Sequence, residues 1–281
     1  MFGRGKIEYK TPEQVRLMRR AGLVVAEALA AVRAQARPGL TTADLDTIAA
    51  DVIRAAGATP SFLGYEGYPA TLCVSVNDEI VHGIPGRRTL EPGDVVSVDC
   101  GAIIEGWHGD SALTLVLADA DPLDVELMVA TENAMWAGIA ALATGHRLGD
   151  VGEAVEDSVD AAQAAGANGG ARYGVIQEYV GHGIGSVMHQ APDVLNYRTR
   201  DRGPRLKRGM CLAIEPMLVR GERGTQVLED DWTVVTDDRS RAAHWEHTVA
   251  ILADGIWVLT ASDGGAERLG ALGIGVVPLA D

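Results

Sequence analysis

The sequence is poor in cysteine and has no long apolar run. Its three cysteines, Cys73, Cys100 and Cys211, include no C-x-x-C pair. An odd number of such residues argues against a disulfide framework and is typical of a reducing cytoplasm. No stretch approaches the roughly 18 apolar residues of a membrane-spanning helix, and the first ten residues lack the apolar core of a signal peptide. We therefore expect a cytoplasmic protein that does not contact a membrane.

Positive charge is also in short supply. The chain has 24 Lys and Arg against 39 Asp and Glu, a formal net charge of −15. This balance makes it a poor candidate for direct binding to the phosphate backbone of nucleic acids. With 281 residues, 47% of them hydrophobic, the chain can bury a sizeable core. Because no change in composition indicates a linker, we expect one domain covering residues 1–281.

Helix caps and apolar spacing predict four helices. They cover approximately residues 12–36, 41–57, 121–144 and 150–166. Thr11 and Gln14 form a capping box at the start of the first helix. Asp150, with Glu153 three residues later, is expected to cap the fourth helix in the same way. Residues 1–10 are expected to form a loose arm.

Short apolar segments bounded by turn residues predict a set of strands. They lie at residues 72–76, 95–100, 112–116, 175–180, 210–216, 233–236, 248–252 and 256–259. Because strands and helices come in alternating blocks, the expected fold class is α+β with a mostly antiparallel sheet. The tail, residues 264–281, is rich in Gly and Ala and is expected to be peripheral.

The sequence also contains a weak internal repeat. Three features of the second helix, its cap, the partner of that cap and its glycine stop, recur 109 residues later in the fourth helix: 41 with 150, 44 with 153 and 57 with 166. Three loop and strand segments match in the same order: 81–85 with 181–185, 90–94 with 206–210, and 96–99 with 211–215. We infer two halves, roughly 12–118 and 123–261, that are related by duplication.

Five residues stand in apolar segments where a charge is costly to bury. They are Asp99, Asp110, His182, Glu215 and Glu246. Taken singly, each carboxylate is explained as a strand end capped by backbone N–H groups. Taken together, four carboxylates in one pocket cannot all ionise without cations. Two divalent metal ions would balance four negative charges, so the sequence predicts a dinuclear hydrolase centre.

This donor set is mostly hard oxygen. A structural zinc site would be richer in thiolate or imidazole, whereas oxygen-rich sites favour Mn, Fe(II) or Co-like ions. A turn near residues 105–106 would place Asp99 and Asp110 side by side in a hairpin. Asp110 and Glu246 could each bridge two ions, and a bridging water would then attack a carbonyl near neutral pH.

Two further histidines are candidates for the same site. His82 is the counterpart of His182 in the repeat, and His189 follows His182 by seven residues. A lone histidine is more often structural than catalytic, but the repeat would aim His82 and His182 at one cleft. His189 could then donate a hydrogen bond to the developing oxyanion.

Over nearly all of residues 12–260 the chain closely resembles type I methionine aminopeptidases. The matching segments are PEQVRLMRRAG from 12, YEGYPATLCVSVNDEIVHGIP from 65, VDCG from 98, GWHGDSALT from 106, GHGIGSVMHQAP from 181, AIEP from 213, DWTVVTDDRS from 231 and WEHT from 245. The resemblance implies a pseudo-twofold pita-bread fold, in which helices flank a curved, mostly antiparallel sheet. It also implies an enzyme that removes N-terminal methionine from nascent proteins and peptides.

The family pattern further implies a role for each of the five residues. His182 and Glu215 hold one metal ion, Asp99 holds the other, and Asp110 and Glu246 bridge them. The ions are Co, Mn, Fe(II), Ni or Zn. Glu215 also shuttles the proton, and a water between the ions is the nucleophile.

The same pattern implies the substrate contacts. His82 and His189 contact the peptide, and with Glu215 they form the implied catalytic set. The methionine pocket is lined by Phe62, Tyr65, Tyr68, Cys73, Met188 and Trp232. Phe62 stands where many members have cysteine and Met188 where many have an aromatic residue, and the pocket stays apolar at both. The implied partner is the N-terminal peptide of a nascent protein, bound by a monomer that associates transiently with ribosomes.

Two alternatives remain open at this point. Proline-specific peptidases of the aminopeptidase P or prolidase kind share the five ligands, but they normally carry an extra N-terminal domain, and residues 65–69 fit the methionine branch better. A non-catalytic binding module or ribosome-associated factor of the same fold would typically lose ligands, and this chain keeps all five.

Overall fold

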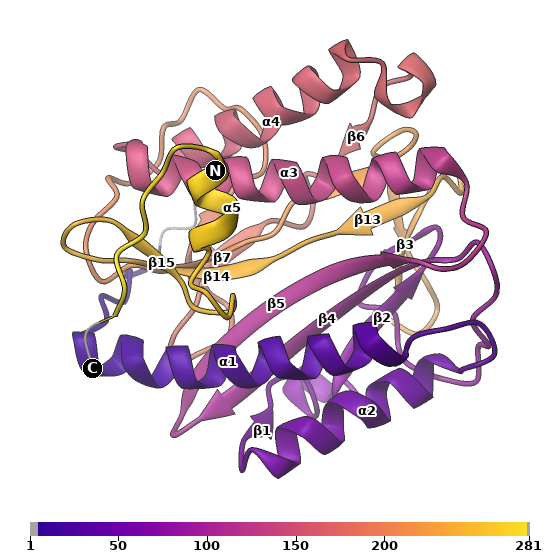
Figure 1. The fold of residues 1–281 in the computed structure, drawn as a ribbon, viewed down its shortest axis with the longest axis horizontal. Helices are drawn as coiled ribbons and strands as arrows, with labels where there is room; N and C mark the ends of the chain where they lie inside the picture. The colour runs from indigo at the N-terminus through magenta and orange to yellow at the C-terminus, as the bar shows by residue number, and fades with distance from the viewer. Residues whose placement is uncertain (1–4, 280–281) are drawn as a thin grey trace.

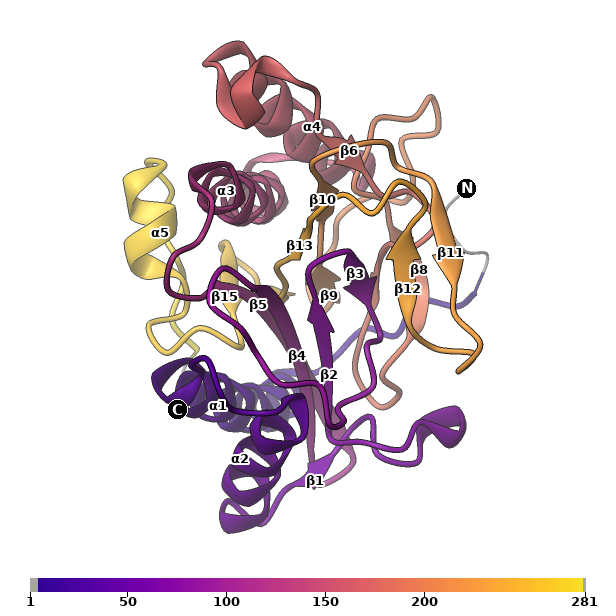
Figure 2. The same cartoon turned by 90° about the vertical axis from the view of Figure 1, so that its right-hand side faces the viewer.

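Two pairs of helices flank the strands. The computed structural model describes residues 5–279. Helices α1 (Pro12–Gln35) and α2 (Thr42–Ala55) lie on one side of the strands, and α3 (Pro122–Thr144) and α4 (Gly149–Ala164) lie on the other (Figures 1 and 2). A short fifth helix, α5 (Ala266–Ala271), contacts α3. Within residues 5–279, no helix combines the length and the apolar character needed to cross a membrane.

The strands are mostly short, and those that pair do so antiparallel. They are β1 (Thr59–Pro60), β2 (Leu72–Val76), β3 (Glu79–Val81), β4 (Val95–Ile104), β5 (Trp107–Val116), β6 (Gly174–Val175), β7 (Gly181–Gly183), β8 (Gln190–Val194), β9 (Cys211–Ile214), β10 (Met217–Val219), β11 (Thr225–Val227), β12 (Val234–Thr236), β13 (Ala242–His244), β14 (His247–Ile251) and β15 (Ile256–Val258). Short 3-10 turns cover Tyr65–Gly67 and Ala167–Gly170.

Two larger sheets meet at the centre of the molecule. One has the order β1-β4-β2, with β5 paired to β4, and the other has the order β15-β14-β9-β7-β8. They are joined where Ala112 and Glu246 exchange two backbone hydrogen bonds of 3.3 and 3.0 Å. Two three-stranded sheets, β13-β10-β6 and β11-β12-β3, complete the body. Asp110 and Glu246, two of the candidate metal ligands, lie beside this junction.

Helix α1 shows how local sequence positions this junction. Thr11 and Gln14 form the expected capping box, with hydrogen bonds of 2.8 and 3.3 Å. The apolar face of the helix packs against β4 and β5. A Cβ atom on Gly109 would lie 2.6 Å from the backbone nitrogen of Gly22. The backbones of α1 and β5 can therefore pack this closely only because both positions are glycine. This contact fixes β5 one residue before Asp110.

The start of the fourth helix differs from the expectation. Helix α4 begins at Gly149, and Leu148 occupies the cap position without a side-chain bond. Asp150 lies inside the first turn, where its Oδ2 accepts the backbone N–H groups of His146 and Arg147 at 2.7 and 2.9 Å. Asp150 therefore closes the preceding loop and does not cap the helix. The glycine stop was correct, since Gly166 has φ +93° directly after Ala165.

Two predicted strands are shorter than expected, and after each of them the chain passes to another sheet. The apolar run 175–180 was expected to be one strand, but only its first residue belongs to β6, and β7 begins at Gly181. The run 210–216 becomes β9 and ends at Ile214, and the chain then enters β10 at Met217. In both cases the chain leaves one sheet for another, so an apolar run does not mark one strand.

The expectation of a loose N-terminal arm is wrong for residues 5–10, and residues 1–4 lie outside the described residues. The backbone N–H of Lys10 donates to Gly209 at 2.7 Å, and the Glu8 carboxylate accepts hydrogen bonds from Ser186 and Gln190.

In the tail, Leu269 is fully buried and the N–H of Val277 donates to Ile256 at 3.1 Å. Residues 280–281 lie outside the described part of the chain.

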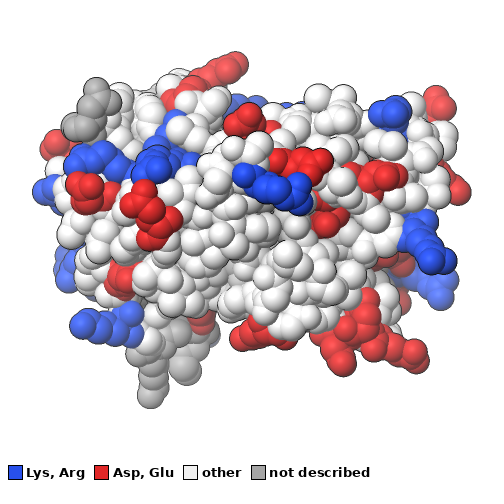
Figure 3. Space-filling model, turned by 90° about the horizontal axis from the view of Figure 1, so that it is seen from below, with Lys and Arg blue, Asp and Glu red and all other residues white. Residues whose placement is uncertain are grey.

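Acidic and basic side chains are interspersed on the surface that faces downward in Figure 1. Figure 3 shows that the Lys and Arg side chains among the described residues on this face do not form a continuous area. The arrangement agrees with the overall negative charge.

Candidate metal centre

The β4–β5 hairpin supplies two of the five candidate ligands. It turns at Glu105 and Gly106, which have φ values of +50° and +80°. Cross-strand partners are Asp99 with Ala112 and Asp110 with Gly101. The two aspartates therefore lie on one face of neighbouring strands, two rungs apart, as the hairpin prediction required.

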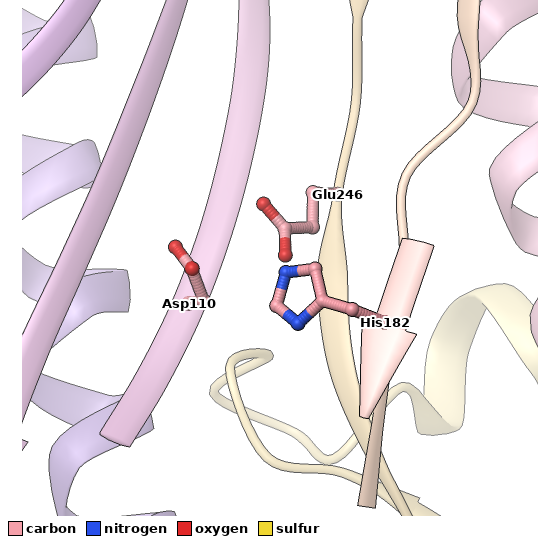
Figure 4. A group of neighbouring side chains, drawn as sticks. All are labelled: Asp110, His182 and Glu246. Atoms are coloured by element: carbon pink, nitrogen blue, oxygen red, sulfur yellow. The ribbon is translucent and has the colours of Figure 1, made fainter. Parts of the chain in front are cut away.

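The second large sheet supplies the other three. His182 lies on β7, Glu215 directly follows β9, and Glu246 directly precedes β14. Because His247 pairs with Ile214, Glu246 lies beside Glu215 where the two strands meet. Figure 4 shows the side chains of Asp110, His182 and Glu246 pointing toward one another from their separate strands.

The polar atoms of these side chains approach closely. One ligand atom from each of Asp110, His182 and Glu246 lies within 4.8 Å of the others. The Nε2 atom of His182 is 3.3 Å from Oε1 of Glu215. All five predicted ligands, Asp99 included, line one cavity of about 180 Å³.

Burial shifts the protonation of the site strongly. It raises the pKa of Asp99 to about 7 and that of Glu215 to about 8. For Asp110 and Glu246, burial and then the neighbouring carboxylates raise the pKa well above its ordinary value. Burial lowers the pKa of His182 to about 3, so this imidazole is neutral and has a free electron pair. Without a cation, the four carboxylates cannot all be ionised.

Several buried atoms of the site lack a hydrogen-bond partner. They are Oδ1 of Asp99, Oδ1 of Asp110, Oε1 of Glu246 and Nε2 of His244. Buried polar atoms are almost always satisfied, so a cluster of orphans needs a ligand. Carboxylate oxygens with one neutral imidazole are the donors that divalent cations of the Mn, Fe(II) and Co type accept. The residues present therefore fit a divalent metal centre.

An apolar pocket adjoins the carboxylates. All six residues expected to form the methionine pocket line the same cavity. Four of them form a buried cluster against which the other two, Tyr65 and Trp232, pack. The ring centroids of Tyr68 and Trp232 are 5.0 Å apart, edge to face. The Tyr68 hydroxyl donates toward the carbonyls of Leu72 and Gly83, both at 3.0 Å, and this fixes the ring.

The two additional histidines also reach this cavity. The rings of His189 and His182 are 4.4 Å apart, and Nδ1 of His189 is 3.0 Å from the hydroxyl of Tyr65. His82 stands at φ +60°, a conformation rare for residues other than glycine and common at functional sites. Burial lowers the pKa of both His82 and His189, the former to about 4.

Sequence reasoning missed His244 and Glu66. His244 is buried, its Nε2 is 3.5 Å from Oε2 of Glu215, and it groups with Glu215 and Glu246 within 4.8 Å. A signal for it existed, because residues two apart on an extended chain share a face, and His244 precedes Glu246 by two. Glu66 lines the cavity from an exposed loop where no such periodicity applies.

Comparison with known proteins places the chain in a family. The model of metallopeptidase family M24 matches residues 16–253. Methionine aminopeptidase 1 of Mycobacterium tuberculosis (strain CDC 1551 / Oshkosh) is 50% identical over 259 residues, which are 92% of this chain and 96% of that protein. Methionine aminopeptidase 1 of Bacillus subtilis (strain 168) is 43% identical over 251 residues, 89% of this chain and 98% of the relative.

Solved structures agree with the sequence relatives. The crystal structure of a methionine aminopeptidase from Thermotoga maritima matches with a TM-score of 0.86 and 40% identity, covering 92% of this chain and 100% of the other. A prolidase from Pyrococcus furiosus shares the fold with a TM-score of 0.69 at 19% identity, covering 90% of this chain but 65% of the prolidase. The expected pita-bread fold is confirmed. The chain belongs to metallopeptidase family M24.

Proposed function

We propose that this protein is a metal-dependent methionine aminopeptidase that removes the N-terminal methionine of nascent proteins and peptides. The observation that carries the proposal is one small cavity that joins the five candidate metal ligands, four of them buried and Asp99 half-buried, to a pocket of aromatic, thioether and thiol side chains. The two sequence relatives described above, which carry this name, are 50% and 43% identical over about nine-tenths of the chain.

Two divalent ions complete the proposed centre. His182 and Glu215 would hold one ion, Asp99 the other, and Asp110 and Glu246 both. When bound, the ions lower the pKa of a water molecule and polarise the scissile carbonyl. The ion is Mn, Fe(II), Co, Ni or Zn, and the oxygen-rich donor set favours the first three.

Two side chains of the protein move or hold protons during the reaction. The Glu215 carboxylate accepts a proton from the attacking water and returns it to the leaving amine. If the Tyr65 hydroxyl donates to Nδ1 of His189, the ring proton is on Nε2 and can be donated to the carbonyl oxygen of the substrate. His82 binds the peptide from the opposite half of the chain.

The apolar walls select the side chain that enters. Met188 and Phe62 are 2% and 6% exposed, and they face the cavity together with Cys73 and the rings of Tyr68 and Trp232. Such walls suit a flexible, polarizable thioether. A polar side chain would be stripped of water there without receiving a hydrogen bond in return.

We further propose that the enzyme is a cytoplasmic monomer that meets its substrates during synthesis, in transient association with ribosomes. Cys73, Cys100 and Cys211 are all free and buried, which agrees with a reducing compartment.

Two peptides test the proposal against the proline-specific alternative. The metal-loaded protein is expected to release methionine from Met-Ala-Ser and to leave Ala-Pro-Ser intact, because the pocket accommodates a thioether. Preference for Ala-Pro-Ser would refute the assignment.

Two variants test the proposed roles. Glu215→Ala is expected to abolish turnover, and Asp99→Ala to weaken metal binding in a calorimetric titration. Unchanged peptidase activity in either variant would count against the site as drawn. Glu13→Gln, on the exposed face of α1, serves as the control that should behave as wild type.

A further inference from the structure

The N-terminal arm packs against the turn that carries two residues of the substrate pocket. This turn, residues 185–190, joins β7 to β8. The Glu8 carboxylate accepts hydrogen bonds from both ends of this turn. At one end the backbone N–H and the Oγ of Ser186 donate at 3.1 and 2.6 Å, and at the other end Nε2 of Gln190 donates at 2.9 Å. One acidic side chain therefore closes the turn.

Glu8 is itself held firmly. Nζ of Lys10 lies 3.3 Å from the Glu8 carboxylate and donates to the Glu8 carbonyl at 3.2 Å, and the Lys10 side chain is only 2% exposed. A Cβ atom on Gly185 would lie 2.2 Å from Oε2 of Glu8, so the arm lies directly on the turn backbone. Burial opposes ionisation, but the bonds from Ser186 and Gln190 outweigh it and lower the pKa of Glu8 to about 2. Glu8 thus stays a carboxylate at neutral pH.

The tip of the turn reaches the site. Met188 is a buried wall of the apolar pocket, and His189 lies 4.4 Å, ring to ring, from His182. On its other side the turn is tied to β5, where the N–H of His108 donates to the Gly185 carbonyl at 3.0 Å. Glu8 and His108 therefore both hold the turn that carries Met188 and His189.

We propose that Glu8 is a positioning residue of the active site: its carboxylate fixes the turn 185–190 and thereby places Met188 and His189 for the reaction. The proposal rests on the proposed function for its kinetic consequences, but its structural content does not depend on it. A misplacement of about 1 Å in a catalytic group can reduce a rate by about 100-fold, so a tether outside the cavity can matter to the chemistry.

Kinetics on Met-Ala-Ser provide the first test. Glu8→Ala is expected to lower kcat/KM by about tenfold, with KM raised through Met188 and kcat lowered through His189. Glu8→Gln keeps the shape and one acceptor oxygen, so it should recover part of the loss. Ser186→Ala removes only the 2.6 Å bond and should give a smaller loss of the same kind. Glu13→Gln is the matched control and should change nothing.

A double-mutant cycle separates positioning from general stability. In a His189→Ala background, Glu8→Ala should lower kcat less than twofold, because the group that it positions for catalysis is gone. If the effects of the two substitutions on kcat simply multiply, Glu8 does not act through His189 and the proposal is overturned.

Hydrogen exchange supplies a readout that does not depend on activity. The backbone N–H of Ser186 donates to Glu8 in the wild type. In Glu8→Ala this amide and the rest of the turn should exchange faster, while α1 and β4 keep wild-type protection. Unchanged exchange in the turn, or wild-type kcat and KM, would overturn the proposal. A wild-type protein that fails to cleave Met-Ala-Ser refutes the proposed function instead, and the exchange result then still decides whether Glu8 orders the turn.

Discussion

Neutralising one of the buried carboxylates should have opposite effects on the metal-free and metal-loaded protein. Asp110 and Glu246 bring oxygens within 4.8 Å of each other, and Oδ1 of Asp110 has no hydrogen-bond partner. In the metal-free protein these groups either repel each other or hold protons that they would release in water. Asp110→Asn removes that penalty, so it should stabilise the metal-free fold while it abolishes activity.

The magnitude follows from the geometry. Two unit charges 4.8 Å apart, the upper limit of this separation, repel by about 3.5 kcal/mol at an effective dielectric constant of about 20. We therefore expect Asp110→Asn to raise the free energy of unfolding of the metal-free protein by about 3–4 kcal/mol at pH 8. At pH 5 the gain should be smaller, because burial and neighbouring charge keep the carboxyl groups protonated there.

Urea denaturation in the presence of a chelator and in the presence of metal measures both effects. Metal should stabilise the wild type more than the variant, because a ligand is lost, and the order of stabilities should then reverse. The matched control is Asp124→Asn. Asp124 is equally buried but paired with Arg220 at 2.5 Å, so its loss should destabilise both forms by about 3–5 kcal/mol. A metal-free Asp110→Asn protein that is less stable than wild type at pH 8 would refute the reasoning.

Three further predictions follow from the same structure. The pKa values of Asp99 and Glu215 are raised to about 7 and 8, so the stability that their protonated forms contribute is fully present below about pH 4 and is lost as the pH rises through 7–8. Chemical denaturation of the metal-free protein should therefore show a free energy of unfolding that falls between about pH 4 and pH 8, and a flat profile would contradict this. Gly109→Ala would place a Cβ atom 2.6 Å from the backbone nitrogen of Gly22. This variant should lower the free energy of unfolding by about 1–3 kcal/mol in urea titrations and should also lower kcat. Wild-type values of both quantities would show that α1 can shift freely. Trp232→Ala removes the ring that packs on Tyr68, so it should raise KM for Met-Ala-Ser more than it lowers kcat, and the reverse pattern would contradict a pocket role.

Local features of the fold could be predicted because local bonds create them. The capping box of Thr11 and Gln14, the stop at Gly166 and the hairpin turn at residues 105–106 each depend on a few neighbouring residues. The convergence of Asp99 and Asp110 followed from that hairpin. Their metal-binding roles remain predictions, although the structure places all five residues in one cavity.

The errors concern information that no local segment contains. The run 175–180 has the composition of a strand, yet only its first residue belongs to one, and the rest connects β6 to another sheet because tertiary pairing decides where a strand ends. Asp150 has the type and spacing of a cap, but it bonds to the loop before the helix instead. Glu8 looks like part of a polar terminus because its partners, Ser186 and Gln190, are far away in sequence.

Titration of metal into the metal-free protein, with methionine release from Met-Ala-Ser followed at each step, tests the central claim most directly. The account predicts no release in the presence of a chelator, and activity that rises with added Mn, Fe(II) or Co and saturates by two equivalents. The Asp110→Asn protein, measured alongside, should stay inactive throughout. Methionine release that persists without metal, or that is unchanged by the loss of Asp110, would contradict the account.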